Sequence, residues 1–414
     1  MKLKQKDSQI AKLIELETNR QKTTLQMIPS ENHCSLAVRE ALGSILTDKY
    51  AEGYPGKRYY GGNEFIDKVE NICIERAKKL FGVEHVNVQP HSGSPANASV
   101  YLATCQAGDT IMGMALPMGG HLTHGFKLSF SGIFFNAISY GLDEKTQLIN
   151  YDEVEKLAKE HNPKLIWVGG SAYSRFIDFK KMGEIADSVG AYLVADIAHI
   201  AGLVAGGVHL SPVPFVHIVT TTTHKTLRGP RGGMIMVTKK GLEKDMDLPK
   251  KIDRAVFPGL QGGPHENSIS AIAVCLKEAS NLAFKKYATQ IVKNAKALVE
   301  ELKKYDFNII SGGTDNHLLL IDLRNKNITG AEAQNLLESV GITINKNSIP
   351  YDPAPPFKPS GIRIGTPAVT TRGMKEKQMR QIAGWINEII LNPKSVKSVR
   401  FGVNKLCKKF PLPK

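Results

Sequence analysis

The sequence predicts an α/β fold: a large domain built on a mainly parallel sheet, followed by a smaller C-terminal α/β domain. Two observations lead to this prediction. Between about residues 68 and 280, short apolar segments alternate with segments of helical periodicity, a pattern typical of β-α-β units. The chain also has 414 residues, which is too long for one simple core, so we expect two domains.

The first 67 residues predict a helical arm followed by an irregular loop. Apolar residues at positions 10, 13, 14 and 16 are spaced as in an amphipathic helix within residues 8–26. Residues 49–67, KYAEGYPGKRYYGGNEFID, have no periodicity and contain four glycines and four tyrosines. Long loops without regular structure are uncommon and often functional, so we expect a functional role for this one.

The large domain is expected over residues 68–280 and the small domain over residues 281–414. A helix is predicted at 68–81, and the apolar strands that follow it are HVNVQ, TIMGM, KLIWVG, AYLVAD, VHIVTTTT and GMIMVT. The small domain is predicted to contain a long helix through KKYATQIVKNAKALVEELKKY, followed by the segments HLLLIDL, GAEAQNLLESVG, ITINKN and GIRIGTPA.

Composition and cysteine usage indicate a soluble, cytoplasmic globular protein. Hydrophobic residues make up 42% of the chain, and the mean hydropathy is -0.19. The charged N-terminus has no continuous apolar segment, unlike a secretory signal. In the most apolar stretch, residues 191–208, Asp196 and His199 favour a buried strand over a membrane span. The five cysteines are scattered singly, as expected for reduced thiols, and no metal site is expected.

The net charge of +15 raises the alternative of a non-catalytic protein that binds RNA. The lysines are spread along the chain, mostly in pairs on predicted helix faces, and no RNA-binding or helix-turn-helix motif accompanies them. A basic solvated surface explains this distribution better, so no nucleic-acid partner is expected.

Two predicted neighbouring strands end in groups of opposite charge. YLVAD ends at Asp196, and HIVTTTTHK ends at Lys225. Ligands of open α/β sheets bind at the carboxyl ends of the strands. A lysine that forms a Schiff base and an aspartate that keeps the pyridinium nitrogen protonated would suit pyridoxal phosphate. The alternative for this pair alone is a structural ion pair at the sheet edge.

A third segment strengthens the cofactor hypothesis. VNVQPHSGSPANASVYLA is a strand, a Gly/Ser turn and a helix, and the backbone N–H groups of Gly93 and Ser94 would bind a phosphate at the helix N-terminus. An ordinary capped turn is the alternative for this segment alone. The phosphate site, the aspartate and the lysine in this order are together much more specific.

Eight motifs between about Gln26 and Phe410 resemble the serine hydroxymethyltransferase family: KYAEGYPGKRYYGG, NVQPHSGSPAN, GGHLTHG, TTTTHKTLRGPRGG, FPGLQGGP, SGGTDNHLLLIDL, NKNSIP and SGIRIGTPA. The resemblance implies a fold-type I pyridoxal phosphate enzyme with a seven-stranded sheet. Its reaction would be the reversible conversion of L-serine and tetrahydrofolate to glycine and 5,10-methylenetetrahydrofolate. Folate-independent cleavage of 3-hydroxy amino acids is the implied side activity.

The same resemblance implies roles for individual residues. Lys225 would hold the cofactor as a Schiff base, and Glu52 would be the general acid/base. The implied catalytic group is completed by Tyr60 and His224. Cofactor contacts would come from Gly93, Ser94, His121, Ser171, Asp196, His199, Thr222, Arg231, Tyr50, Gly262 and Gly263. The implied assembly is a homodimer, or a tetramer, with the active site shared between subunits, because the residues around Glu52 and Gly262 enter the partner's site.

Substrate and folate contacts are implied in the same way. Arg363 would bind the amino acid carboxylate through its planar fork of donors, assisted by Ser30, with Tyr60 and Glu52 also at the substrate. By spacing alone, a solvated arginine on a strand is the better interpretation of Arg363. Tetrahydrofolate would contact Leu116, Gly120, His121, Leu122, Asn347, Pro355, Pro356 and Phe357.

The chain departs from the usual family pattern at Pro29, Pro117, Met118, Arg175 and Pro355. These positions affect the expected folate affinity rather than the cofactor chemistry. A folate-independent threonine aldolase, which uses the same cofactor and cleaves the same class of bond, is the nearest alternative enzyme. Glu52, the GGHLTHG loop and the NKN and PPF segments favour hydroxymethyl transfer over that alternative.

Overall fold

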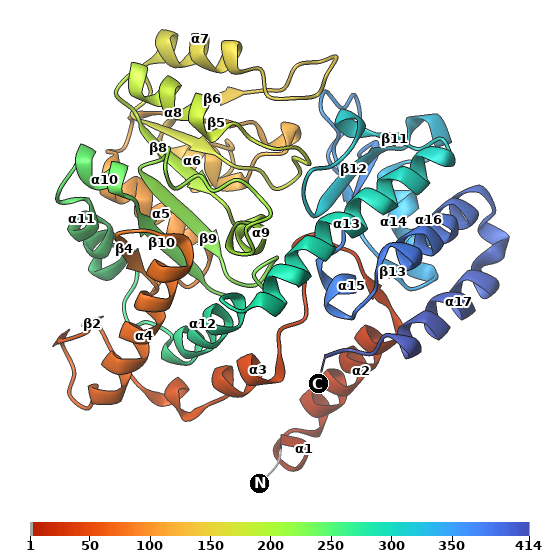
Figure 1. The fold of residues 1–414 in the computed structure, drawn as a ribbon, viewed down its shortest axis with the longest axis horizontal. Helices are drawn as coiled ribbons and strands as arrows, with labels where there is room; N and C mark the ends of the chain where they lie inside the picture. The colour runs from red at the N-terminus through yellow and green to blue at the C-terminus, as the bar shows by residue number, and fades with distance from the viewer. Residues whose placement is uncertain (1–2, 414) are drawn as a thin grey trace.

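A computed structural model describes residues 3–413 of the chain. Its centre is a seven-stranded sheet (Figure 1). In spatial order the strands are β4 (His85–Asn87), β10 (Gly233–Val237), β9 (Ile218–Thr222), β8 (Tyr192–Asp196), β7 (Leu165–Val168), β5 (Thr110–Met114) and β6 (Asn136–Tyr140). Only β10 is antiparallel to its neighbours in this sheet; the others are parallel. This confirms the predicted mainly parallel, seven-stranded arrangement.

Helices cover both faces of this sheet because successive strand residues point to opposite sides. On β5, Ile111 packs in one buried cluster and Met112 in the other, and the same alternation recurs on β7 and β8. The helices of this part are α4 (Glu64–Phe81), α5 (Gly93–Thr104), α6 (Phe130–Phe134), α7 (Tyr151–His161), α8 (Phe179–Ser188), α9 (Ala201–Ala205), α10 (Lys239–Lys244), α11 (Leu248–Arg254) and α12 (Glu266–Ala279).

A second, four-stranded antiparallel sheet lies in the C-terminal part, in the order β11 (Asn308–Ile309), β12 (Leu318–Asp322), β15 (Gly361–Gly365) and β14 (Asn345–Asn347). Its separate apolar core includes Leu319, Ile362 and Ile386. The helices here are α13 (Leu282–Lys304), α14 (Gly330–Ser339), α15 (Pro367–Thr371), α16 (Glu376–Leu391) and α17 (Val396–Lys409). The exact division of the chain at residues 68 and 281 stays a prediction.

The N-terminal segment joins this second part. Strand β1 (Leu25–Gln26) pairs in parallel with β13 (Ile342–Thr343), and the preceding helices are α1 (Leu3–Lys6) and α2 (Ser8–Thr23). Helix α2 runs beside α17 in Figure 1. The predicted N-terminal helix is thus present, but its apolar side is not covered: Leu13 is 60% exposed and Ile14 53%.

Four expectations about local structure differ from what is observed. Residues 49–67 are not wholly irregular, because a short hairpin of β2 (Gly53–Tyr54) and β3 (Lys57–Arg58) lies within them. Helix α4 begins at Glu64 rather than at 68, since acidic residues in its first turn favour a helix start there. The predicted strand through residue 223 ends at Thr222, and ITINKN forms two short strands rather than one.

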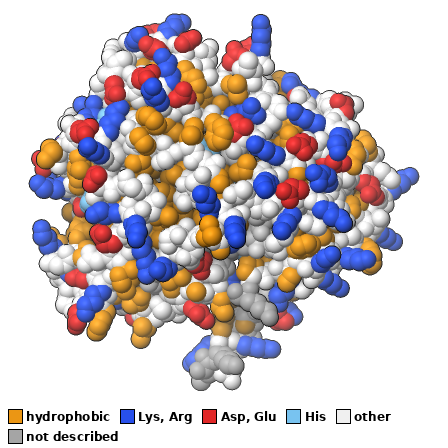
Figure 2. All heavy atoms as spheres, viewed as in Figure 1, with side chains coloured by type: hydrophobic (Ala, Val, Ile, Leu, Met, Phe, Trp, Pro, Cys, Tyr) orange, Lys and Arg blue, Asp and Glu red, His pale blue; other side chains and the backbone are white. Residues whose placement is uncertain are grey.

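None of the helices in residues 3–413 is long and apolar enough to cross a membrane. Figure 2 shows Lys and Arg side chains scattered over the visible face and interspersed with Asp and Glu. On that face, therefore, the positive charge is spread and does not form a continuous basic surface.

Candidate active site

Strands β8 and β9 are parallel neighbours, and their carboxyl ends bring Asp196 and Lys225 to one cavity. Lys225 follows the last residue of β9, Thr222, by three positions, so the loop after the strand rather than the strand itself carries the lysine. The cavity is lined by Gly93, His121, His124, Gly170, Ser171, Asp196, Ala198, His199, Thr222 and Lys225. Seven of these ten were predicted as cofactor contacts.

Asp196 is held as a carboxylate. Its Oδ2 accepts a hydrogen bond from Asn97 Nδ2 at 3.0 Å and lies 3.2 Å from Nε2 of His124, and its Oδ1 accepts one from the backbone N–H of Ala198. Burial alone would raise the pKa of Asp196, but the hydrogen bond to His124 and the nearby positive charges hold it far below its usual value. An ionised aspartate at this position can keep a proton on a ring nitrogen facing it.

Sequence reasoning missed Asn97 and His124. Asn97 lies one helical turn after Gly93 on α5, so its spacing from the predicted phosphate turn was a usable signal. His124 is the second histidine of GGHLTHG, and its ring stacks on Trp167 with centroids 5.0 Å apart. The sequence does not distinguish His124 from an ordinary histidine in a turn, because its stacking contact depends on where β7 places Trp167.

Lys225 has the reactivity that a covalent cofactor needs. Burial lowers its pKa to about 8; the charge of Asp196 opposes this shift, and Arg363 and Arg231 add to it. A sizeable neutral fraction of the amine is therefore present near pH 8. Its backbone is fixed by Asn32, another residue not predicted, whose Nδ2 donates to the Lys225 carbonyl at 2.8 Å.

The first turn of α5 is open to an anion. Ser92, at the N-cap, makes no side-chain capping bond, which leaves the N–H groups of Gly93 and Ser94 available. A Cβ at Gly93 would lie 2.8 Å from Cγ2 of Thr222, so glycine is needed for the close approach of β9. An open helix N-terminus, a carboxylate and a lysine of lowered pKa around one cavity fit pyridoxal phosphate.

Two predicted histidines face this cavity as neutral rings. Burial lowers the pKa of His121 to about 4, and its Nδ1 lies 2.8 Å from Oγ1 of Thr123. His199 is buried, and burial together with the charge of Lys225 lowers its pKa well below the usual value. Its Nδ1 lies 3.2 Å from Nε2 of His317, a residue for which no role was predicted.

Arg363 reaches the same site from the second sheet. It lies in β15, donates from Nε to Oδ1 of Asn345 at 3.1 Å, and bonds from Nη1 to the carbonyl of Ser171. Burial lowers its pKa to about 10, which still leaves it cationic at neutral pH. The bond to Ser171 brings this guanidinium next to the cavity, so the solvated-arginine interpretation is wrong.

A second group of predicted residues gathers elsewhere. Tyr50 Oη donates to Oε1 of Glu52 at 3.1 Å, and the rings of Tyr50 and Tyr60 lie 4.9 Å apart. A Cβ at Gly262 would be 3.0 Å from that same Glu52 oxygen, and one at Gly263 would be 3.2 Å from the Tyr50 ring. None of the five lines the Lys225 cavity, and Tyr50 is 53% exposed and Tyr60 48%.

The backbone around Glu52 is fixed from beneath by a buried polar base. Arg58 Nη1 donates to the carbonyls of Ala51 and Gly53, on either side of Glu52. The same guanidinium is held by Glu70 at 2.7 Å and by Asp67 at 2.9 Å. Glu52, a partly buried catalytic candidate, thus lies on a well-ordered backbone.

The remaining predicted residues divide between a neighbouring hollow and the surface. Ser30, His224 and Arg231 line one further hollow together. On the expected folate side, Leu122 is 48% exposed and Phe357 is 84% exposed. Leu116 and Gly120 belong to the same 116–122 segment as Leu122. Asn347 ends β14, and Pro355 and Pro356 directly precede Phe357. Arg175, a departure from the family pattern, forms an ion pair with Asp315 at 3.3 Å.

A family model for serine hydroxymethyltransferase matches residues 3–386 of the 414-residue chain. The chain belongs to the serine hydroxymethyltransferase family. Enzymes of this family are pyridoxal phosphate-dependent transferases with tetrahydrofolate as co-substrate, and they interconvert serine and glycine. The predicted family, fold class and reaction are confirmed, and the match favours hydroxymethyl transfer over the aldolase and RNA-binding alternatives.

Proposed function

We propose that this chain carries out the family reaction with the residues of the Lys225 cavity holding pyridoxal phosphate. The observation that carries the proposal is the delivery of Asp196 and Lys225 to one cavity by neighbouring parallel strands. Pyridoxal phosphate, when bound, supplies an electron sink for cleavage of the bond between the α and β carbons of serine. The protein's own residues bind, orient and exchange protons around it.

Lys225 would hold the cofactor through its amine, which a pKa of about 8 leaves partly unprotonated. Asp196 would face the ring nitrogen and keep a proton on it. The first turn of α5 would hold the phosphate through the N–H groups of Gly93 and Ser94. His121, His124 and Asp196 have possible metal-binding atoms within 4.8 Å of one another. The distance between His124 and Asp196 is that of a hydrogen bond, so we assign these three residues to the cofactor ring rather than to a metal ion.

Arg363 binds the carboxylate of serine. Two of its five N–H groups are used by Asn345 and Ser171, which leaves three for the substrate. Because those two bonds fix the guanidinium plane, the carboxylate is held in one orientation, and orientation decides which bond of the amino acid is cleaved. Ser30 assists this contact.

The active unit is a homodimer in which the Glu52 group of one chain completes the Lys225 cavity of the other. Glu52 handles the proton of the substrate hydroxyl and of the folate, and Gly262 and Gly263 reach the partner's phosphate. Tyr50 and Tyr60 are exposed in the single chain, as expected of groups that need a second subunit. The uncovered apolar side of α2 adds surface for such an interface.

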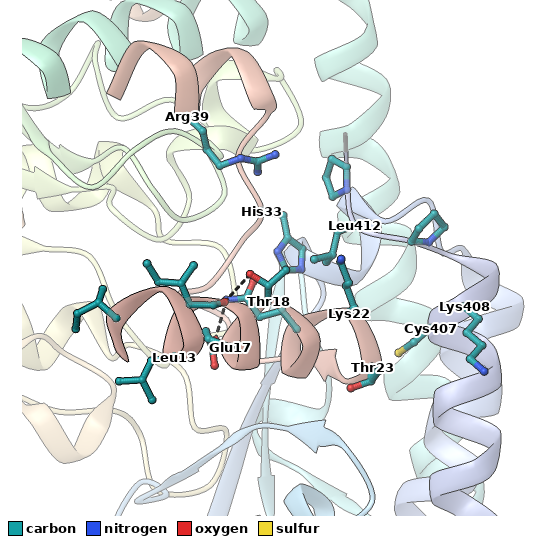
Figure 3. Close-up of a pocket in the computed structure, with 15 residues that line it drawn as sticks. Leu13, Glu17, Thr18, Lys22, Thr23, His33, Arg39, Cys407, Lys408 and Leu412 are labelled. Carbon is teal, nitrogen blue, oxygen red and sulfur yellow. Dashed lines mark hydrogen bonds between the residues drawn. The ribbon is translucent and has the colours of Figure 1, made fainter. Parts of the chain in front are cut away.

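Figure 3 shows this side of α2, with Leu13 projecting from the helix and His33 and Leu412 across a hollow from it. An exposed apolar helix face costs free energy unless something covers it, and a second subunit would do so. A tetramer built from two such dimers, a cytoplasmic location and folate-independent cleavage of 3-hydroxy amino acids complete the proposal.

The test is glycine formation from L-serine by the purified protein, with and without tetrahydrofolate. We expect strong dependence on the folate. Equal rates without it, with L-threonine cleaved as readily, would mean that the departures at Pro117, Met118, Arg175 and Pro355 have removed the folate site and left an aldolase. A colourless protein with neither activity would contradict the assignment of the cavity itself.

A further inference from the structure

One buried contact at the cavity, between His199 and His317, has no role in the account above. His317 immediately precedes β12, and its side chain is fully buried. Its Nε2 lies 3.2 Å from Nδ1 of His199, which follows β8 and lines the Lys225 cavity. The contact therefore links the second sheet to the cofactor site.

Both rings of this pair are neutral. Burial, then the charge of Arg363, lowers the pKa of His317 to about 3, with His209 and Lys225 adding to the effect. Burial and the charge of Lys225 lower the pKa of His199, with Arg363, His317 and His121 contributing in the same direction. A neutral imidazole carries one N–H, so one of the two rings donates to the other at this contact.

The other nitrogen of His317 decides which ring donates. Nδ1 of His317 is buried and has no hydrogen-bond partner among the described residues. If His199 were the donor, the proton of His317 would lie on this nitrogen as a buried N–H without an acceptor. If His317 is the donor, Nδ1 carries only a lone pair. Orphaned buried N–H groups are rarer in proteins than acceptors that lack a partner, so the second arrangement is favoured.

We propose that His317 is a positioning residue: it donates from Nε2 to His199 and so fixes the proton of His199 on Nε2. Nε2 is the nitrogen of His199 that remains free to serve the cavity. His199 then offers a hydrogen-bond donor, not an acceptor, to the cavity. A donor there would favour the ionised form of a cofactor oxygen that it contacts. The effect on bound pyridoxal phosphate rests on the proposed function, whereas the proton position on His199 does not.

The direct test is a long-range ¹H–¹⁵N correlation spectrum of the holoenzyme labelled with ¹⁵N-histidine. It reports which nitrogen of each neutral ring carries the proton, and the signals of His199 and His317 are assigned from the spectra of His199→Asn and His317→Gln. We expect Nε2–H for both rings. A proton on Nδ1 of His199 would overturn the inference.

Two variants separate positioning from packing. His317→Gln keeps a donor near the position of Nε2. The midpoint of the pH dependence of the cofactor's visible absorbance should therefore stay as in wild type, and kcat should stay within about threefold of wild type. His317→Leu removes the donor, and we expect a displaced absorbance midpoint and a fall in kcat of about tenfold, with KM for serine little changed. Equal behaviour of the two variants would overturn the positioning role.

The outcomes also distinguish this inference from the proposed function. Wild-type protein without folate-dependent turnover would contradict the function, while the proton position on His199 is still read from the spectrum. If His317→Leu fails to fold, the wild-type spectrum and the His317→Gln variant still test the inference. The glutamine variant keeps a donor at this position, so the proton of His199 must remain on Nε2 in it.

Discussion

The two groups of site residues in this chain are built in opposite ways. Around Lys225 the side chains are buried, and Asp196 has hydrogen-bond partners on both oxygens. Around Glu52 the tyrosines are about half exposed, although the backbone beneath them is fixed by Arg58. The first group has its hydrogen-bond partners within one chain, and burial shifts its pKa values. The second is ordered but partly exposed, as expected of the proposed site shared between subunits.

The largest expected effect comes from the group around Lys225. Lys225→Ala removes the only amine at this cavity among the described residues, and we expect serine turnover to fall at least about 1,000-fold. The variant should still fold, because Lys225 makes no side-chain hydrogen bond to the groups that form the core. The measurement is multiple-turnover glycine formation, with circular dichroism as the check on folding. Undiminished repeated turnover would refute the role of Lys225.

Arg363→Ala tests whether the two sheets cooperate at this cavity. Loss of a two-point carboxylate contact should cost roughly 2–3 kcal/mol, or about 100-fold in kcat/KM for serine, while the cofactor stays bound. Arg363→Lys should recover only part of this loss because lysine lacks the planar fork.

The matched control for Arg363 is Arg324→Ala, since Arg324 lies just after β12 and pairs with Asp322 in a half-exposed ion pair. The kcat/KM of Arg324→Ala should stay within about twofold of wild type because Arg324 does not line the Lys225 cavity. Normal turnover in Arg363→Ala, measured with the visible absorbance of the cofactor intact, would mean that another group binds the carboxylate.

Mixing two inactive variants tests the contrast between the groups directly. Lys225→Ala and Glu52→Gln should each be inactive alone. In a random mixture of equal amounts, half of the dimers contain one chain of each kind, and each of these has one site with both groups intact. We therefore expect about a quarter of the wild-type activity. Chains unfolded together and refolded provide the mixture, and chains refolded separately provide the control. No recovery would place Glu52 in the same chain's site.

Much of the group around Lys225 could be predicted from local patterns in the sequence. The order of a phosphate turn, Asp196 and Lys225 along the chain follows from β-α-β topology, which brings strand ends to one edge. The roles of Asn32, His124 and His317 could not be predicted this way, because each depends on a contact between segments far apart in the sequence. Likewise, the amphipathic pattern of α2 predicts a helix, but it does not predict whether another segment covers its apolar side.

The smallest expected effect concerns the support beneath Glu52. Glu266 begins α12, and both of its carboxyl oxygens are buried without hydrogen-bond partners among the described residues. Burial and the neighbouring charge of Glu70 raise its pKa to about 8; Arg58, 3.9 Å away, opposes the shift and Asp67 adds to it. The folded protein therefore keeps a proton on Glu266 that the unfolded chain releases above its ordinary pKa near 4.5.

The contribution of Glu266 to the free energy of unfolding should consequently be fully present below pH 4.5. It should decline as the pH rises toward 8, because unfolding then releases a proton. Glu266→Gln imitates the protonated group, so it should match wild type near pH 4 and exceed it by about 2 kcal/mol at pH 6. Urea unfolding at fixed protein concentration measures this difference, and Glu64→Gln, on the exposed first turn of α4, is the control that should show none. If Glu266→Gln followed the wild-type pH curve, Glu266 would be ionised in the folded protein. Arg58 would then be shared between two buried carboxylates, leaving a looser support for the backbone around Glu52.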